Sequence, residues 1–515
     1  MPFDTLRAYV EALRKAGELA VVDAPVDRRL EVAEIADRVM KAGGPALLFT
    51  RVRGSKVPVL INAFGSQRRM AMAFGAGSLE EVAQRLRALL AFTPPGEGFF
   101  EKLGALRALA PLANAVPRTV AHGSCQDVVL RTPDLSKLPV LTTWPLDGGP
   151  FITLPLVITA DPRSGRYNIG MYRMQVYNAR ETGMHWQRHK HGRAHADAWG
   201  KKIPVAVAIG ADPVLTYAAT APLPPVLDEY AFAGILRGAP VKLVAAKTVP
   251  LKVPADAEFI LEGYVDNEDL RSEGPFGDHT GVYSLADRYP TFHVTAMTHR
   301  RNPIYAATLV GKPPMEDAWI GKATERIFLP FLQMVLPEVV DMNLPVEGGF
   351  HNLAIVSIRK AYPGHAKKVM NALWGLGHMM MLTRMLVIVD ADVDVQDPRT
   401  VAWFVLNNLA PERDVVLMPG PVDDLDHGSY NVAYGTKLGI DATRKSAAEG
   451  YERQWPPDIA MDRATRCLVD RRWREYGLDR IMRSLHTDDW SGQGQQALAR
   501  LMRSPGVAPM QPREK

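Results

Sequence analysis

The chain contains 515 residues, of which 61 are Lys or Arg and 56 are Asp or Glu, so its net charge is +5 with the 13 histidines neutral. At roughly 100–200 residues per domain, this length predicts about three domains. Hydrophobic residues make up 47% and charged residues 23% of the chain, proportions that exclude a wholly disordered protein. No apolar run approaches the ~20 residues that span a bilayer.

The sequence pI of about 9.0 does not predict a nucleic-acid-binding protein. Acidic residues interleave with basic ones throughout the chain, whereas nucleic-acid binders usually concentrate Lys and Arg in a stripe or tail. The charge predicts at most a weak attraction to anionic surfaces or substrates. Cys125 and Cys467 cannot form a disulfide framework, and the N-terminus lacks the apolar core of a signal peptide. We therefore expect a cytoplasmic protein.

The first segment has the pattern of a small α/β unit. Apolar residues recur at helical spacing over 6–13 and 30–39. Gly43-Gly44 is expected to end the second helix, and the apolar residues 46–49 to begin a strand. Proline-rich residues 93–98 then separate this segment from the next.

The middle of the chain, about 119–320, is rich in short β-like stretches between turns, at 151–159, 241–247, 257–265 and 292–300. Apolar and polar positions alternate in several of them. This pattern favours a β-barrel or a sandwich over a parallel sheet.

Longer helical patterns return from about residue 327. Helices are predicted over 328–340, 365–382 and 400–409, with a strand at 385–390. This order predicts a second α/β domain. The last predicted helix, 461–485, is charged with one apolar stripe, so it must pack on its own chain or on a neighbouring subunit.

Four of the 13 histidines fall within residues 185–195. His185 and His189, and likewise His191 and His195, have the i, i+4 spacing that lets a helix chelate a metal such as zinc. No glutamate completes an HExxH motif, and Gly192 weakens the helical interpretation. Three interpretations stay open: a multi-histidine zinc site, a basic loop that binds an anion with one histidine as a ligand, and a solvated loop.

Two shorter stretches could carry chemistry. Residues 168–173, with Asn, Gly and Arg, could present backbone N–H groups and a guanidinium to an anion, or could be an ordinary turn. Glu273 and Asp278 flank a Gly-Pro-Phe-Gly turn that can bring both carboxylates to one pocket. Close carboxylates separate in pKa, which would leave one ionised and one as an acid. The alternative is a hairpin with two exposed acids.

Taken together, several stretches in order resemble the UbiD family of decarboxylases, which use prenylated FMN. They are 6–19 (LRAYVEALRKAGEL), 31–49 (EVAEIADRVMKAGGPALLF), 168–175 (NIGMYRMQ), 205–213 (VAVAIGADP), 228–238 (DEYAFAGILRG), 273–284 (EGPFGDHTGVYS), 363–374 (PGHAKKVMNALW) and 434–445 (YGTKLGIDATRK). The resemblance implies an N-terminal α/β domain (1–118) and a central split β-barrel domain of the flavin-reductase type (119–320). It also implies a C-terminal α/β domain (321–460) and a terminal helix and tail (461–515) that contact another subunit in a homo-oligomer, a dimer or a hexamer.

By position, the resemblance implies that Asn168, His191 and Glu229 bind a divalent metal, manganese alone or with potassium, that holds the flavin phosphate. Hard cations favour carboxylate and amide oxygens, and one imidazole completes the set. The resemblance therefore favours manganese over zinc as the bound metal. The residues expected to bind the cofactor are Asn168, Met171, Tyr172, Arg173, His185, Trp186, Gln187, Lys190, His191, Glu229 and Arg384. Arg384 stands where relatives often carry a lysine that faces the phosphate.

The resemblance also implies that Arg173, Glu273 and Asp278 are catalytic. Loss of CO2 from an sp2 carbon leaves an electron pair that cannot delocalise, so the cofactor must accept it. Arg173 would orient the carboxylate with Glu273 as its partner. Asp278 would protonate the carbon, which requires a pKa raised towards neutrality.

Within the family, residues 316–333 and 439–445 resemble the quinone-biosynthesis branch. The implied substrate is a polyprenyl-4-hydroxybenzoate, with a menaquinone-pathway dihydroxynaphthoate or another aromatic or heteroaromatic acid as the alternative. A flavin prenyltransferase would supply the cofactor, and a polyprenyl substrate implies peripheral contact with the inner face of the membrane. A multi-histidine zinc hydrolase stays the alternative from another class.

Overall fold

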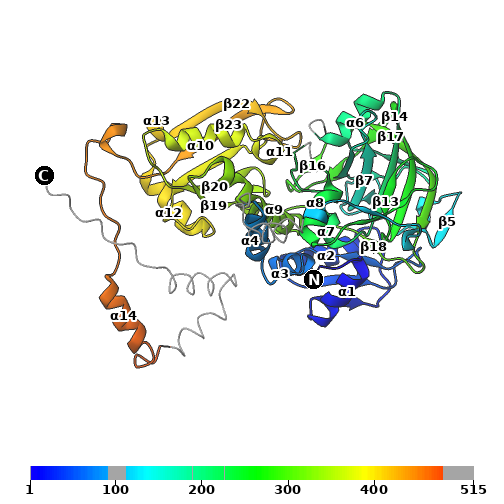
Figure 1. Cartoon of the computed structure of the whole chain (residues 1–515), viewed down its shortest axis with the longest axis horizontal. Helices are drawn as coiled ribbons and strands as arrows, with labels where there is room; N and C mark the ends of the chain where they lie inside the picture. The colour runs from blue at the N-terminus through cyan, green and yellow to red at the C-terminus, as the bar shows by residue number, and fades with distance from the viewer. Residues whose placement is uncertain (1, 91–111, 188–189, 225–226, 479–515) are drawn as a thin grey trace, which may run out of the picture.

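The computed structural model describes residues 2–90, 112–187, 190–224 and 227–478 (Figure 1). The N-terminal and central parts of the chain lie together on one side of the molecule, and the C-terminal sheet with its helices lies on the other. The long helix α9 (Glu316–Val335) lies between these two parts. No helix among the described residues combines the length and apolar character that crossing a bilayer requires.

The N-terminal part is the predicted α/β unit. Its helices are α1 (Leu6–Lys15), α2 (Glu31–Lys41), α3 (Gln67–Ala73) and α4 (Leu79–Leu90), and its strands are β1 (Leu19–Val22), β2 (Ala46–Phe49) and β3 (Val59–Ile61). β18 (Tyr305–Ala306), from much later in the chain, completes the sheet in the order β1-β2-β3-β18. Both helices predicted in this segment and the strand at 46–49 are confirmed.

The central part is built on a seven-stranded sheet, and every pair of neighbouring strands in it is antiparallel. Its order is β10-β17-β14-β11-β7-β8, with β5 paired to β17. The strands are β5 (Val128–Leu130), β7 (Pro155–Ala160), β8 (Tyr167–Met171), β10 (Glu181–Gly183), β11 (Lys202–Ile209), β14 (Phe259–Glu273) and β17 (Asp287–His299). The sheet is not parallel, as the sequence pattern predicted. The β-barrel or sandwich, and the split β-barrel that the resemblance implies, stay predictions.

Shorter elements surround this sheet. The helices are α6 (His191–Trp199), α7 (Pro213–Ala218) and α8 (Glu229–Arg237). The strands are β4 (Arg118–Thr119), β6 (Phe151–Ile152), β9 (Met174–Gln175), β12 (Lys242–Ala245), β13 (Lys252–Pro254), β15 (Phe276–Gly277) and β16 (Tyr283–Ser284). β15 and β16 form a small hairpin that follows directly on the end of β14.

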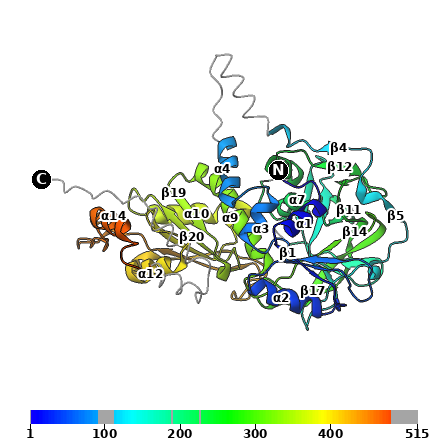
Figure 2. The same ribbon diagram turned by 90° about the horizontal axis from the view of Figure 1, so that it is seen from below.

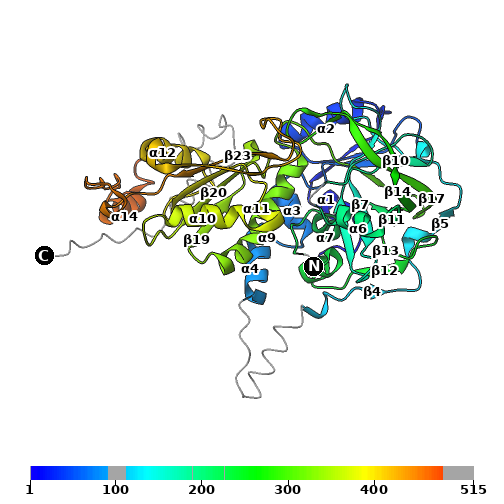
Figure 3. The same cartoon turned by 90° about the horizontal axis from the view of Figure 1, so that it is seen from above.

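The C-terminal part is a five-stranded mixed sheet of order β19-β20-β21-β23-β22. Its strands are β19 (Val339–Asn343), β20 (Leu353–Ile358), β21 (Met385–Asp390), β22 (Val415–Pro421) and β23 (Tyr434–Asp441), and its helices are α10 (His365–Trp374), α11 (Gly377–Met380), α12 (Pro398–Asn408) and α13 (Pro411–Asp414). α10 and α12 cover opposite faces of the sheet (Figures 2 and 3). The predicted second α/β domain is therefore present.

Two helix predictions in this part need correction. The helix predicted at 328–340 is the second half of α9, which ends at Val335, and Val339 already begins β19. The reason is Pro337, since a residue before proline is disfavoured in the helical conformation. The helix predicted at 365–382 is interrupted after Trp374, because Gly375 ends α10 and α11 starts separately.

The terminal helix α14 (Arg463–Arg472) is shorter than the prediction of 461–485, part of which lies outside the described residues. It stands apart from the domains in Figure 1, and none of its residues is buried. The apolar side chains of Ile459, Met461 and Leu468 are exposed on and before it. This segment therefore leaves its apolar residues uncovered by the described part of the chain.

One buried carboxylate joins the three parts of the chain next to α9. Glu316, the first residue of that helix, is fully buried. Its Oε1 accepts a hydrogen bond of 2.7 Å from the Phe64 N–H, and its Oε2 accepts one of 2.7 Å from the Thr308 hydroxyl. A buried carboxylate without such partners would be strongly destabilising. The pair of bonds therefore sets where α9 begins relative to both the N-terminal and the central part.

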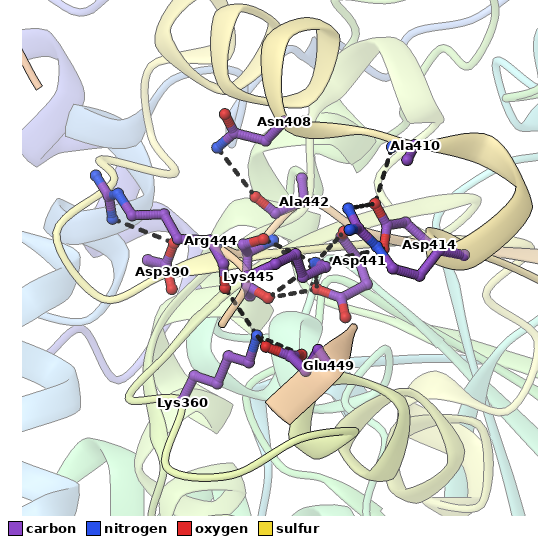
Figure 4. A network of polar contacts seen from close by, with 12 residues as sticks. Lys360, Asp390, Asn408, Ala410, Asp414, Asp441, Ala442, Arg444, Lys445 and Glu449 are labelled. Atoms are coloured by element: carbon purple, nitrogen blue, oxygen red, sulfur yellow. Dashed lines mark hydrogen bonds and ion pairs between the residues drawn. The ribbon is translucent and has the colours of Figure 1, made fainter. Parts of the chain in front are cut away.

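A network of buried charged side chains lies at the ends of β21 and β23 and at the start of β22 (Figure 4). The ammonium group of Lys445, whose side chain is 1% exposed, lies 2.9 Å from Asp441 Oδ1 and 3.6 Å from Asp414 Oδ1. It also donates to the carbonyl oxygen of Thr443 at 2.7 Å. Beside it, Lys360 pairs with Glu449, and Arg444 donates to Asp390 at 3.1 Å. The network fixes the segment that follows β23 against the ends of β21 and β22.

Replacing Lys445 by methionine tests this network. Removing the cation leaves the buried carboxylate of Asp441 without its ion pair and leaves Asp414 with Arg413 alone. The free energy of unfolding of the C-terminal domain should therefore fall by about 3–5 kcal/mol. Scanning calorimetry of the full chain measures the loss. Lys15→Met, at an exposed lysine paired only with Glu11, is the control and should leave the transition unchanged. Equal transitions for the two variants would contradict a structural role for the network.

Candidate active site

A cavity of about 370 Å³ opens where the central and C-terminal parts meet. β8, the residues that follow it and the start of α8 form one side, and α9 with the segment around Phe350 and His351 forms the other. The predicted site residues that line it are Asn168, Met171, Tyr172, Arg173, His185, Gln187, Lys190, His191, Glu229 and Asp278. The structure thus brings together residues that are up to 110 positions apart in the sequence.

Arg173 lies at the centre of a buried ionic cluster. Its Nε donates to Glu273 Oε1 at 2.8 Å and its Nη2 to Glu273 Oε2 at 3.1 Å, so the two side chains form a bidentate pair. Nη1 is ion-paired with Asp278, and the guanidinium carbon lies 4.8 Å from the centre of the Phe276 ring. The two carboxylates therefore hold one guanidinium between them, and it faces the cavity.

The turn between β14 and β15 explains how Glu273 and Asp278 reach the same guanidinium. Glu273 is the last residue of β14, and Gly274 follows with φ of +92°, a conformation that favours glycine. The β15–β16 hairpin then carries Asp278 back towards Arg173. The alternative prediction of a hairpin with two exposed acids is wrong, because Glu273 is 0% and Asp278 7% exposed.

The surroundings of Glu273 favour its ionised form. Burial by itself would raise its pKa, but hydrogen bonds from His185 and Arg173 outweigh burial and lower the pKa to about 2. The His185 Nδ1 lies 3.2 Å from Glu273 Oε2. Glu273 does not line the cavity, so it supports Arg173 and His185 from behind.

The prediction that Asp278 has a raised pKa is wrong for this arrangement. Burial would raise the pKa, but the hydrogen bond and charge of His279 and the charge of Arg173 hold it well below its ordinary range. His279 Nδ1 lies 2.9 Å from Asp278 Oδ1, and the His279 N–H donates to the same oxygen at 2.8 Å. Asp278 is therefore a carboxylate with a histidine on one side and an arginine on the other.

Three titratable residues of the cavity wall were not predicted from the sequence: His279, His351 and Asp317. The two imidazoles meet, with 2.7 Å between their Nε2 atoms. Asp317 lies on α9, and burial raises its pKa to about 7. In the sequence, the only signal for His279 is its place directly after Asp278 in the motif GDHTG. His351 comes from a segment between η3 (Val346–Gly348) and β20 that carries no motif.

The predicted metal ligands lie on three elements that meet at one end of the cavity. Asn168 is on β8, His191 begins α6 and Glu229 begins α8. Asn168 and Glu229 are 5% and 6% exposed. Glu229 Oε2 accepts a hydrogen bond of 2.7 Å from the Ile169 N–H, and burial raises the pKa of Glu229 to about 8. An amide, an imidazole and a desolvated carboxylate form a donor set that suits a hard divalent cation.

Two aromatic side chains and a glycine shape the cofactor end of the cavity. Tyr172 lines the cavity, and Trp186 packs edge-on against it with 5.4 Å between ring centroids. A Cβ on Gly170 would lie 2.3 Å from the Tyr172 ring, so only glycine leaves room for the tyrosine to fold back. Trp186 itself lies behind the cavity wall.

Two further predictions concern Arg384 as a cofactor contact and the histidines of 185–195 as a metal site. Arg384 does not line the cavity: its side chain is 44% exposed and pairs with Asp426 at 2.6 Å. The histidines do not converge either. His185 bonds to Glu273 and His195 to Thr159, and His189 lies outside the described residues. Among the residues that the structure covers, no group of three or more His, Cys, Asp or Glu is placed to hold a metal, which weighs against the multi-histidine zinc hydrolase.

Comparison with known proteins agrees with this geometry. Models of the 3-octaprenyl-4-hydroxybenzoate carboxy-lyase (UbiD) family match residues 10–89 (N-terminal domain), 118–313 (Rift-related domain) and 318–442 (C-terminal domain). An uncharacterized protein of Archaeoglobus fulgidus is 53% identical over 480 residues, 92% of this chain and 99% of that protein. One of Aquifex aeolicus is 47% identical over 481 residues, with the same coverage.

Solved structures show the same fold. The vanillic acid decarboxylase of Sedimentibacter hydroxybenzoicus in its closed form is 26% identical, with a TM-score of 0.82 over 93% of this chain and 99% of that one. The UbiD-class enzyme HmfF from Pelotomaculum thermopropionicum, in complex with FMN, is 29% identical, with a TM-score of 0.73 over 88% of this chain and 97% of that one. The chain therefore belongs to the UbiD family of carboxy-lyases.

Proposed function

We propose that this protein decarboxylates an aromatic carboxylic acid with prenylated FMN bound in the cavity. The observation that carries the proposal is the buried Arg173, held by Glu273 and facing the cavity beside Asp278. It combines a group that binds a carboxylate with an acid at the same point. HmfF is a relative whose structures contain FMN or prenylated FMN, which supports the choice of cofactor.

The residues at the other end of the cavity fit the cofactor and its metal. Asn168, His191 and Glu229 would hold Mn²⁺, alone or with K⁺, because a cation there offsets the desolvation of the Glu229 carboxylate. Lys190 also lines the cavity and adds a positive charge for a phosphate. Met171, Tyr172, His185 and Gln187 would line the flavin, with Trp186 supporting Tyr172. A contact between Arg384 and the phosphate stays a prediction.

In this proposal, Arg173, Glu273 and Asp278 have separate roles in the reaction. Arg173 binds and orients the carboxylate of the substrate, and its bidentate pair with Glu273 keeps the guanidinium in place. When bound, prenylated FMN supplies the electron sink for the pair that the departing CO2 leaves on the carbon. Asp278 delivers the proton that replaces CO2. The buried surroundings of the cluster keep water away from the reacting carbon.

For the substrate, we propose an acid of quinone biosynthesis, a polyprenyl-4-hydroxybenzoate or a dihydroxynaphthoate. The family's name and the apolar side chains on the cavity wall, among them Leu154, Ile320 and Leu344, support an aromatic substrate. A flavin prenyltransferase would supply the cofactor, and a polyprenyl tail would bring the protein to the membrane surface. The uncovered apolar residues around α14 support a homo-oligomer in which this helix packs on another subunit.

Co-expression with a flavin prenyltransferase tests the whole proposal. The purified protein should carry a prenylated flavin by mass spectrometry and should release CO2 from one or more acids in a panel of hydroxybenzoates, polyprenyl-hydroxybenzoates and dihydroxynaphthoates. Protein expressed without the prenyltransferase is the control and should be inactive. A loaded protein that leaves every acid of the panel unchanged would argue against this function.

Removing the carboxylate of Glu229 should remove metal and cofactor together. In Glu229→Ala the hard-cation site loses its anionic ligand, so both Mn and flavin should fall to a small fraction of one per chain, as measured by elemental analysis and flavin absorbance. Glu268→Ala, at an exposed glutamate paired only with Lys201, should keep both. A Glu229→Ala variant that keeps its full flavin content but contains no metal would contradict the prediction that the metal holds the cofactor.

Asp278→Asn should abolish turnover and leave the flavin bound. The amide keeps the size of the side chain but cannot deliver a proton, so the rate should fall by about 100- to 10,000-fold. Asp287→Asn, at an exposed aspartate on β17, is the control. CO2 release at the wild-type rate by Asp278→Asn would show that another group donates the proton.

A further inference from the structure

A chain of three titratable side chains runs from the reacting end of the cavity into the C-terminal part of the molecule. His279 Nδ1 lies 2.9 Å from Asp278 Oδ1, and His279 Nε2 lies 2.7 Å from His351 Nε2. All three residues line the cavity. His279 belongs to the central part, whereas His351 comes from the loop before β20. The proposed reaction assigns no role to either histidine.

The charges around His279 favour its cationic form. The carboxylates of Asp278, of Asp317 on α9 and of Asp423 after β22 all act on it, and the neighbouring rings of Phe350 and His351 carry no negative charge. Burial by itself would lower the pKa of His279, but the hydrogen bond to Asp278 and these three carboxylates outweigh it and raise the pKa. The proton therefore belongs on the imidazole and not on Asp278, whose pKa is held low.

This distribution leaves Asp278 without a proton of its own. Decarboxylation of a carboxylate consumes one proton for each CO2 released, because a C–H bond replaces the C–C bond. An aspartate beside Arg173 that stays ionised cannot supply that proton unless a neighbour passes one to it. His279 is the hydrogen-bonded neighbour whose nitrogen faces the carboxylate oxygen.

We propose that His279 stores the proton that Asp278 delivers, so that the acid of this site is the Asp278–His279 pair. The proposal rests on the proposed function. The proton moves from His279 Nδ1 to Asp278 Oδ1 and from Asp278 to the carbon that loses CO2. The C–C bond to the carboxylate breaks, its electron pair ends in the new C–H bond, and His279 becomes neutral. One proton from solvent then restores the imidazolium.

His351 is a positioning residue for this proton. With His279 charged, both of its nitrogens carry hydrogens, so Nε2 must donate and His351 Nε2 must accept. Burial and the charge of His279 lower the pKa of His351, which keeps it neutral and able to accept. Without His351, the buried Nε2–H of a charged His279 would lose this acceptor. Through His351, the Asp278–His279 pair is in contact with the C-terminal part of the molecule.

The location of the proton can be measured without any substrate. In flavin-loaded protein with ¹³C- and ¹⁵N-labelled histidine, the signal of His279 is assigned by its loss in His279→Gln. We expect His279 to stay protonated at pH values where an ordinary histidine side chain is neutral. We also expect the pKa of His279 to fall in Asp278→Asn. A neutral His279 with Nδ1–H, accepting from His351, would overturn the proposal, as would a pKa that Asp278→Asn does not move.

The pH dependence of turnover tests the transfer itself. Because the raised pKa keeps His279 protonated at lower pH, CO2 release by wild-type enzyme should be level below the pKa measured by NMR and should fall above it. His279→Gln should lose that inflection and be about 100-fold slower near neutrality, with its flavin content unchanged. His122→Gln is the control. If the pH dependence of CO2 release by His279→Gln keeps the wild-type inflection, the proposal is wrong.

The two measurements also separate this proposal from the proposed function. If the loaded enzyme turns over no acid of the panel, the function fails, but the spectra still report where the proton resides. Should His279→Gln not fold, Asp278→Asn keeps His279 in place, and its spectrum decides the point.

Discussion

The site depends on one buried cation, the guanidinium of Arg173, whose side chain is 8% exposed. Removing an arginine from water is costly unless carboxylates and hydrogen bonds replace the lost hydration. Glu273, Asp278 and the Ser284 hydroxyl supply those partners. Glu273 ends β14, Asp278 directly follows β15 and Ser284 ends β16, so the cluster holds the hairpin against the end of β8. The position of the reacting carbon follows from that constraint.

The same electrostatics decides where protons reside. A carboxylate next to an arginine stays ionised, so the cluster around Arg173 makes Asp278 a poor reservoir for a proton. A histidine surrounded by Asp278, Asp317 and Asp423 has the opposite tendency. In the proposed reaction, carboxylate binding and proton storage therefore belong to neighbouring residues and not to one side chain.

The cavity also depends on how the parts of the chain meet. Glu316 joins the first turn of α9 to Phe64 and Thr308, and α9 supplies Asp317 and Ile320 to the cavity wall. On the far side, the buried ammonium of Lys445 holds the end of β23 against β22. Each is a buried polar group whose partners come from separate segments, and moving those segments apart would leave the group without its partners.

Local patterns in the sequence predicted the helices at 6–13 and 30–39, the strand at 385–390 and a β-rich centre that is not a parallel sheet, because periodicity and turn residues act over a few positions. The motifs also identified Arg173, Glu273 and Asp278 before their contacts were known. Only the tertiary structure decided that Asp278 is ionised, that Arg384 pairs with Asp426, and that His351 meets His279 across 72 positions. Proton location and long-range contacts depend on burial and on charges from distant segments, and no local pattern contains that information.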